Sequence, residues 1–344
     1  MDPHLLDSLD RSLLNALQRE FPLVPQPFSQ IAHQLDAPPE EVLARASRLK
    51  SSGTIRQISA IFDSRALGYR SSLVAFEVPP ERVDDAAAVV NRNPGVSHNY
   101  LRQHRYNLWF TLTVHPARSL EEEVAQLVSG AGARRARVLP ALRVFKIGVN
   151  LDMSADADDS KREHGAGSRS SASAERLSER EIEAVRVLQR DTPIIERPFA
   201  AAAADAGMSE EQLLGIAADL QGRGVMRRFA AVLRHRAAGF TANAMAVWKV
   251  PEERSEEVGQ IMASFAAVSH CYQRPTFDDW PYSLYTMIHA RSSEACHRIA
   301  AQIAEETGVS EYELLFSTKE YKKVRVQYFT DEDLEYARRA KDRR

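Results

Sequence analysis

Residues 96–115 read VSHNYLRQHRYNLWFTLTVH and alternate apolar or β-branched residues with histidines, arginines, tyrosines and a tryptophan. Such alternation is typical of two short strands that pack one face on a core. A second stretch, residues 268–289, reads VSHCYQRPTFDDWPYSLYTMIH and opens with the same Val-Ser-His. Because titratable, cationic and aromatic groups recur in both, the pair indicates a repeated site rather than a plain core.

The rest of the chain repeats around these two stretches. Five pairs are separated by 171 residues, and after one inserted residue the separation becomes 172, which aligns Val78 with Val250 and His98 with His270. The chain is therefore a tandem duplication. Between the copies, Asp152–Arg176 is rich in Ser, Ala, Asp and Gly with almost no large apolar side chain, which predicts a flexible linker. The five pairs are Pro27 and Pro198, Gly53 and Gly224, Arg56 and Arg227, Arg65 and Arg236, and Gly68 and Gly239.

Length and composition set wide limits on function. A chain of 344 residues exceeds one ordinary compact domain, so we expect several. A formal charge of −2 and a pI of about 6.6 give no global cationic surface for nucleic acid. There is no basic leader before an apolar run and no stretch of about eighteen apolar residues, which predicts a soluble cytoplasmic protein. Two cysteines without a CxxC pair argue against disulfides and thiolate metal sites.

Each copy opens with three predicted helices, at 5–19, 28–35 and 39–49 in the first. In the second copy, Ser178 with Glu181 and Ser209 with Gln212 have the spacing of capping boxes that start the first and third helices. The glycine after each third helix predicts a left-handed C-terminal residue. Short helices joined by tight turns favour a helix-turn-helix, and the apolar-alternating runs at 55–63 and 225–234 favour a wing hairpin in each copy.

The remainder of each copy alternates strands and helices. In the first copy we expect strands at 72–78, 96–102, 107–114 and 142–150, with helices at 80–91 and 119–129. The second copy predicts strands at 244–250, 268–273, 283–289 and 322–329, with helices at 251–265 and 292–307. This βαββαβ order is that of a ferredoxin-like fold. The sequence thus predicts an α+β tandem duplication with helix-turn-helix segments at 1–62 and 177–233, ferredoxin-like domains at 63–151 and 234–344, and the linker at 152–176.

A helix-turn-helix before a ferredoxin-like domain resembles the Lrp/AsnC family of bacterial regulators, which implies DNA binding. A recognition helix needs donors near its start and cations for phosphates. The third predicted helix begins instead with Glu40 and Glu41 in the first copy, and with Glu210 and Glu211 in the second. Carboxylates at that end repel the phosphate backbone. We therefore expect these segments to pack or build a dimer, with DNA as an improbable partner.

Strand alternation places a histidine, a tyrosine and an arginine on one face of each copy. Arginine binds carboxylates through paired hydrogen bonds, aromatic rings stack on flat ligands, and histidine transfers protons or ligates iron near neutral pH. The arrangement favours a flat anionic ligand. A buried structural role for both histidines stays open, because duplication would copy a structural histidine as well. The residues are His98, Tyr100 and Arg102, repeated as His270, Tyr272 and Arg274.

Other candidates flank these strands. His104 and Arg105 occupy the turn between the first copy's strands, where the second copy has PTFDDWP and no histidine. His289 ends a strand, where a role in the site and a role as a space-filling residue are equally open. His115 precedes Pro116 at a strand exit, which favours a space-filling role.

The basic residues after the predicted wings are further candidates. A Gly-aromatic pair follows Arg65 in the first copy and Arg236 in the second, and Arg234 and His235 directly precede Arg236. These residues either bind carboxylates or are simply solvated cations. Nearby, Cys271 is interpreted as a core residue.

The chain closely resembles the siroheme decarboxylases, of the fused NirD-NirL form related to the AhbA-AhbB heterodimer. The resemblance rests on SHNYLRQHRYNLWFTLT and on SHCYQRP with WPYSLYTMIH, and it covers nearly all of the chain outside the linker. Ordinary Lrp/AsnC regulators lack these runs. The resemblance implies loss of CO2 from two acetate side chains of siroheme, giving 12,18-didecarboxysiroheme in heme d1 or alternative heme biosynthesis.

That reaction implies roles for the candidate residues. His98, His104 and His270 become candidate catalytic residues, with His104 or His270 as a ligand of the substrate iron. Arginines would hold the eight carboxylates of siroheme, and no cofactor or protein-bound metal is expected beyond this iron tetrapyrrole. The substrate-binding candidates are Arg65, Tyr100, Arg102, Arg105, Arg234, His235, Arg236, Tyr272, Arg274 and His289.

Among partners, we expect siroheme and an internal pseudo-dimer, and no membrane. Further homo-oligomers and association with other heme d1 biosynthesis proteins stay open. The alternatives are an Lrp/AsnC-type transcriptional regulator, a haem-sensing protein and a non-catalytic tetrapyrrole carrier. A regulator predicts salt-dependent retention on DNA, whereas an enzyme predicts loss of CO2 from siroheme.

Overall fold

The computed structural model describes residues 6–147, 177–233 and 242–335, so the predicted linker lies outside the described residues. The six predicted helices of the two helix-turn-helix segments are present, and both predicted capping boxes are confirmed. Gly53 and Gly224 follow the third helices with φ of 76° and 74°, as their positions predict. The helices are α1 (Ser8–Arg19), α2 (Pro27–Gln34), α3 (Pro39–Ser51), α6 (Glu179–Leu188), α7 (Pro198–Asp205) and α8 (Glu210–Gly222).

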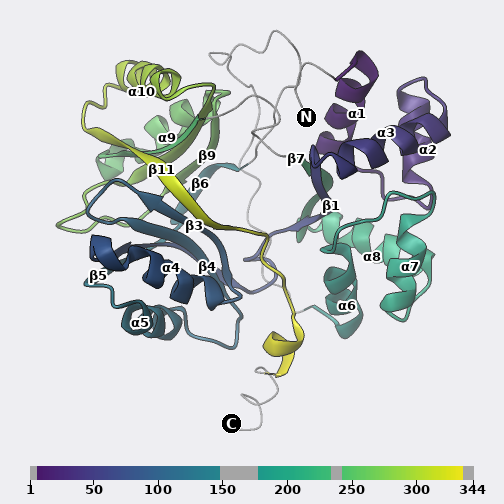
Figure 1. Ribbon diagram of the computed structural model, residues 1–344, viewed down its shortest axis with the longest axis horizontal. Coiled ribbons are helices and arrows are strands. Elements are labelled where there is room, and N and C mark those ends of the chain that lie inside the picture. Colours follow the sequence, from purple (N-terminus) through teal and green to yellow (C-terminus); the bar gives the residue numbers. More distant parts are fainter. Residues whose placement is uncertain (1–5, 148–176, 234–241, 336–344) are drawn as a thin grey trace.

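The helices of both copies pack together on one side of the molecule (Figure 1). One apolar core joins them, and its centre is a cluster of aromatic rings. Phe21 contacts Phe28 edge-on with ring centroids 5.3 Å apart, and Phe199 contacts Phe229 at 5.5 Å. Phe21 also contacts Phe199 at 6.2 Å, which links the copies directly. The two helix-turn-helix segments therefore share one core.

The wing hairpins predicted within each copy are wrong. The strands themselves exist, as β1 (Ile55–Phe62) and β7 (Met226–Leu233), but they pair with each other in an antiparallel two-stranded sheet. Apolar alternation identifies a strand and its buried face, but it does not identify the partner strand. A duplicated chain offers two equivalent partners, and here the pairing runs between the copies.

The ferredoxin-like halves lie on the opposite side of the molecule and share a nine-stranded sheet (Figure 1). Its strand order is β5-β2-β4-β3-β11-β8-β10-β9-β6. The first half contains β2 (Arg70–Glu77), η2 (Pro80–Arg82), α4 (Val83–Arg92), β3 (Val96–Arg102), β4 (Leu108–Val114), α5 (Leu120–Ala131), β5 (Arg135–Pro140) and β6 (Arg143–Ile147). The second contains β8 (Ala242–Trp248), η4 (Glu252–Arg254), α9 (Ser255–Ser264), β9 (Val268–Gln273), β10 (Leu284–Ala290), α10 (Ser293–Thr307) and β11 (Tyr312–Lys323).

The strand predicted at 142–150 is present as β6, but it is not the fourth strand of the first half, which is β5. The fourth strand of the second half is β11, which overlaps the predicted range 322–329 only at its end. β5 and most of β11 were missed because their cation-rich sequences lack a clean apolar alternation. After its fourth strand, the chain of each half continues onto the sheet of the other half. β6 pairs with β9, and the end of β11 pairs with β3. The halves thus exchange strands reciprocally.

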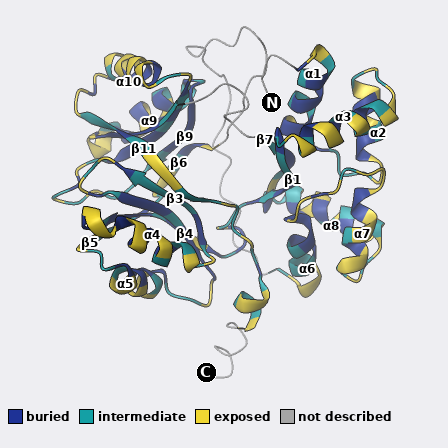
Figure 2. Ribbon diagram, in the orientation of Figure 1, coloured by how far each residue is buried: buried dark blue, intermediate teal, exposed yellow. Residues whose placement is uncertain are grey.

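Helices cover the outer face of each half, and the inner faces build a fourth core that joins the halves. Trp109 of β4, Tyr285 of β10 and Leu315 of β11 all belong to it. Figure 2 shows most strand residues and the inward sides of the helices buried or half-buried, with exposed residues on the outward helix surfaces and on part of β11. No helix in residues 6–147, 177–233 and 242–335 is both long and apolar enough to cross a membrane.

Candidate active site

The repeated histidine, tyrosine and arginine lie on the inner face of β3 and β9, as the alternation predicts. Tyr100 pairs with Trp109, and Tyr272 pairs with Tyr285, both of which belong to the core between the halves. Asn99, between them in sequence, points the other way and donates to the Ala87 carbonyl on the helix side. The structure thus brings each triplet together on a strand beside the interface between the halves.

Arg102 is buried and Arg274 is half-buried, and both reach into the other half. Arg102 donates through Nη1 to the Leu315 carbonyl of β11, and Arg274 donates to the Leu139 carbonyl of β5. Burial lowers the pKa of Arg102 to about 10 and also lowers the pKa of Arg274. In the described part of the chain, the buried Nε of each arginine has no hydrogen-bond partner. Each cation therefore keeps one buried N–H group without a partner in the described residues.

The tyrosine of each triplet lies close to the arginine, and the histidine ring lies beside the tyrosine ring, with centroids 6.2 Å apart in the first copy and 6.0 Å apart in the second. The Arg274 guanidinium is 4.7 Å from the centre of the Tyr272 ring, and Arg102 is 5.7 Å from Tyr100. Burial, assisted by Glu320, raises the pKa of Tyr100 to about 12, so the phenol stays protonated at neutral pH. The His98 Nδ1 lies 3.0 Å from the Ser97 hydroxyl.

His98 is neutral in the free protein at pH 7. Burial, followed by the like charges of Lys323 and Arg56, lowers the pKa of His98 to about 4. The second copy differs in its neighbours. There the Ser269 hydroxyl lies 2.8 Å from His270 Nδ1 and 2.8 Å from His289 Nε2, so one hydroxyl joins two imidazoles.

The turn that carries His104 and Arg105 docks on the second half. His104 packs edge-on against Trp280 with ring centroids 5.1 Å apart, and its Nε2 lies 3.7 Å from Glu313. Burial lowers the pKa of His104. Trp280 is fully buried.

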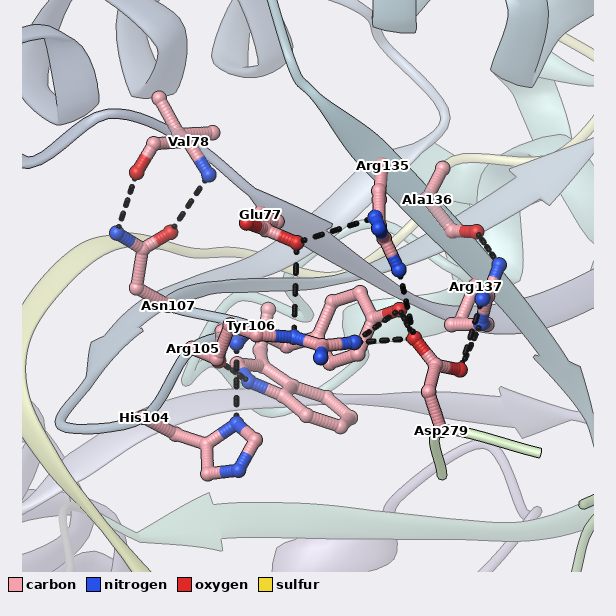
Figure 3. A network of polar contacts seen from close by, with 11 residues as sticks. Glu77, Val78, His104, Arg105, Tyr106, Asn107, Arg135, Ala136, Arg137 and Asp279 are labelled. Atoms are coloured by element: carbon pink, nitrogen blue, oxygen red, sulfur yellow. Dashed lines mark hydrogen bonds and ion pairs between the residues drawn. The ribbon is translucent and has the colours of Figure 1, made fainter. Parts of the chain in front are cut away.

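Arg105 belongs to an ion-pair network centred on Asp279 (Figure 3). Asp279 accepts from Arg137 at 2.8 Å and from the Tyr106 hydroxyl at 2.8 Å, and Arg105 also pairs with it. These contacts, with Arg137 foremost, hold the pKa of Asp279 well below its usual range. The charge of Arg105 is thus offset within the protein, at the junction of the two halves.

Of the remaining basic residues predicted for the site, only Arg65 lies within the described residues. Arg65 donates to the Ala141 carbonyl. Burial raises the pKa of Tyr272 and lowers the pKa of Arg274, and the charge of Arg65 opposes the first shift and adds to the second, so Arg65 lies beside the second triplet. Arg234, His235 and Arg236 lie outside the described residues.

A cavity of about 520 Å³ opens beside the first triplet, bordered by β1, β4 and residues 324–333. A cavity of this size is typical of sites for small organic ligands. Its lining includes three arginines, Arg56, Arg118 and Arg325, together with His115. The site residues predicted from sequence do not line it, and His115 was interpreted as a filling residue. Arg56 connects the cavity with His98, whose pKa it lowers.

Half-buried arginines gather at this cavity, whose lining also contains Glu123 and Asp333. Burial lowers the pKa of Arg325 to about 10, and the neighbouring charges of Arg228 and Arg56 act in the same direction. Burial also lowers the pKa of Arg228. Clustered guanidinium groups repel one another, so the arrangement favours an anionic ligand. Sequence reasoning missed these residues, although the recurrence of Arg56 as Arg227 was a usable signal.

Known proteins resemble this chain over nearly its full length. An AsnC-like ligand binding domain model matches residues 66–146 and 237–322, and a siroheme decarboxylase NirDL-like HTH domain model matches residues 10–56 and 181–227. The siroheme decarboxylase of Hydrogenobacter thermophilus is 43% identical over 325 residues, covering 93% of this chain and 95% of that protein.

Two further comparisons agree with this assignment. A crystal structure of the siroheme decarboxylase NirDL in complex with an iron-uroporphyrin III analogue superposes with a TM-score of 0.75 at 37% identity, covering 98% of this chain and 99% of that one. The siroheme decarboxylase beta subunit of Methanosarcina barkeri is 44% identical and matches 44% of this chain and 99% of its own length, as expected for an internal duplication. The chain therefore belongs to the siroheme decarboxylase family, in the form that carries both halves on one polypeptide.

Proposed function

We propose that the protein is a siroheme decarboxylase that removes CO2 from two acetate side chains of siroheme and yields 12,18-didecarboxysiroheme. The observation that carries the proposal is identity of 43% to such an enzyme over 325 residues, which spans both halves. In chemical terms the enzyme is a carbon-carbon lyase of heme d1 or alternative heme biosynthesis. A solved relative holds an iron-uroporphyrin analogue, which supports an iron tetrapyrrole as ligand.

The described residues fit a ligand with many carboxylates. Arg56, Arg228 and Arg325 form a cation cluster beside the cavity, and their mutual repulsion is relieved when carboxylates enter. Arg102 and Arg274 each keep a buried Nε without a partner in the described chain. Buried donors of this kind gain a full charge-assisted hydrogen bond from a ligand carboxylate. Binding should therefore depend on guanidinium groups more than on apolar area.

The reaction needs a proton as well as binding energy. When an acetate loses CO2, the bonding electron pair remains on the methylene carbon, and a proton from the enzyme completes the methyl group. We propose His98, His104 and His270 as candidates for this donor, with His104 or His270 as the alternative ligand of the substrate iron. His98 begins as a neutral imidazole. The carboxylates of an incoming tetrapyrrole would raise its proton affinity, so substrate binding itself would load this group.

Partners and cofactors follow from the same proposal. The two halves act as an internal pseudo-dimer, because subunit relatives correspond to single halves. The iron tetrapyrrole supplies its own metal and electron-withdrawing ring, so we propose that the reaction uses no additional cofactor.

The proposal is tested by incubating the purified protein anaerobically with siroheme and analysing the tetrapyrroles by mass spectrometry. We expect a product lighter by two CO2, formed in proportion to enzyme. Arg325→Gln should weaken tetrapyrrole binding, measured from the Soret absorption change, by roughly tenfold or more, the loss of one charge-assisted contact. Arg19→Gln, at the end of α1 and away from the cavity, is the matched control. If siroheme keeps its mass, the proposed function is wrong.

A further inference from the structure

The second copy contains a hydrogen-bonded chain that the first copy lacks. Ser269 of β9 is 5% exposed, and its hydroxyl lies 2.8 Å from both His270 Nδ1 and His289 Nε2. His289 comes from β10, the neighbouring strand of the same sheet. Both imidazoles are only partly buried. One buried hydroxyl therefore bridges two histidines that approach it from adjacent strands.

The corresponding position in the first copy shows that the bridge is not required by the fold. Ser97 contacts His98 Nδ1 at 3.0 Å, just as Ser269 contacts His270. On the neighbouring strand, however, register places Thr113 where the second copy has His289. The Thr113 hydroxyl donates instead to Ser71 at 3.0 Å. The same strand pair is thus built with one imidazole in one half and with two in the other.

We propose that His289, Ser269 and His270 form a proton relay that supplies the reacting carbon of the tetrapyrrole. This inference rests on the proposed function and deepens it by naming the path of the proton. A hydroxyl can donate one hydrogen bond and accept others, so it can receive a proton on one side while releasing one on the other. The two bonds of 2.8 Å are short enough for such transfer.

The transfer balances in atoms and charge. Loss of CO2 leaves an electron pair on the methylene carbon, which takes the proton from His270 Nε2 and becomes a methyl group. His270 Nδ1 then accepts the Ser269 hydroxyl proton, and the serine oxygen accepts the proton of His289 Nε2. His289, which enters this step as an imidazolium, has passed one proton along the chain and becomes a neutral imidazole, and His270 has exchanged one tautomer for the other. His289 is reprotonated from water. In this scheme Ser269 is a positioning residue, since it acts through His270.

A purely structural bridge is the competing interpretation. The Ser269 hydroxyl also lies 3.4 Å from the Met287 carbonyl, and donation there would leave it accepting from both imidazoles without conducting a proton. The two interpretations differ in the rate of proton transfer and in its isotope sensitivity, but they predict similar effects on stability.

The experiment compares Ser269→Ala, Ser269→Thr, His289→Asn and the double variant Ser269→Ala/His289→Asn in the anaerobic siroheme assay. For a relay, Ser269→Ala and His289→Asn each lower kcat about tenfold or more, and the double variant loses no more than the worse single variant. The solvent deuterium isotope effect on kcat rises in Ser269→Ala because proton supply limits the rate. Ser269→Thr, which keeps the hydroxyl, restores most activity. Soret titration confirms that the variants bind tetrapyrrole.

Ser72→Ala is the matched control, because Ser72 is also a buried strand serine, but its hydroxyl donates only to the neighbouring Leu73 carbonyl. It should leave kcat and the isotope effect unchanged. A Ser269→Ala variant that turns over within twofold of wild type, or an unchanged isotope effect, overturns the relay while the decarboxylase proposal stands. Wild-type protein that leaves siroheme intact overturns both.

Discussion

His98 provides a prediction in which the structure fixes the sign, the size and the pH window. The ordinary pKa of histidine is 6.5, and burial, Lys323 and Arg56 lower the pKa of His98 to about 4 in the folded chain. Above pH 6.5 the imidazole is neutral in the folded and unfolded states, so it adds no pH dependence. As the pH falls below 6.5, His98 binds a proton in the unfolded chain but not in the folded chain, so the free energy of unfolding decreases.

The resulting loss of stability is confined to the interval between pH 6.5 and about 4, below which the folded chain also binds the proton. The difference between the two pKa values corresponds to at most about 3 kcal/mol, since partial exposure to solvent reduces the effect. Wild-type protein should therefore lose more unfolding free energy between pH 7 and pH 5 than His98→Gln does. Urea unfolding at both pH values, followed by tryptophan fluorescence, measures this difference.

The titration of His98 can also be followed directly. In protein labelled with ¹⁵N-histidine, the His98 ring signals, assigned from their absence in His98→Gln, should remain those of a neutral imidazole down to pH 5. Removing the like charge in Lys323→Gln should raise the pKa of His98 part of the way towards 6.5. A His98 signal that titrates at pH 6.5 or above in the wild type would refute the reasoning from burial and charge.

Two further predictions concern the junction of the halves. A Cβ on Gly259 of α9 would lie 2.4 Å from the Phe145 ring of β6, so Gly259→Ala should destabilise the protein by about 1–3 kcal/mol. Adding Phe145→Leu should restore part of the lost stability. Equal stability of Gly259→Ala and wild type in urea would contradict this close contact. Asp279→Asn removes the carboxylate that Arg105, Arg135 and Arg137 share, so these arginines repel one another and Tm should fall. In 0.5 M salt the Debye length is roughly 5 Å or less, so screening should reduce the Tm difference between variant and wild type. A Tm difference independent of salt would argue against charge repulsion.

Local pattern was enough to predict the elements that hold the candidate site. The alternation in residues 96–102 places His98, Tyr100 and Arg102 on one face because side-chain direction in a strand has a period of two, and β3 follows it over that range. Capping residues such as Ser178 fixed helix starts for an equally local reason: the serine hydroxyl accepts from a backbone N–H three residues away.

What local pattern could not predict is which segments meet. The wing strands pair between copies, and Arg325 reaches the Ser59 hydroxyl of β1 from a segment more than 250 residues later in the chain. Neither contact has a local signature, because strand pairing and long-range cation placement depend on the path of the whole chain. The cavity and its arginine cluster are products of that path, and this is why they were missed while the triplets were found.

The exchanged strands also explain why two copies of one motif have different chemistry. The end of β11 places Lys323 opposite His98 and Glu320 opposite Tyr100, whereas β6 places Ile147 opposite His270 and Val144 opposite Tyr272. Lys323 opposes a positive charge on His98, and an aliphatic side chain adds no such opposition at His270. Each histidine lies on a strand that pairs with a strand from the other half. A substitution in one half therefore changes the electrostatics of the site in the other. Two sites with different neighbours can coexist in one pseudo-symmetric chain for that reason, and the histidine with the second imidazole behind it is the better placed to be reprotonated after each turnover.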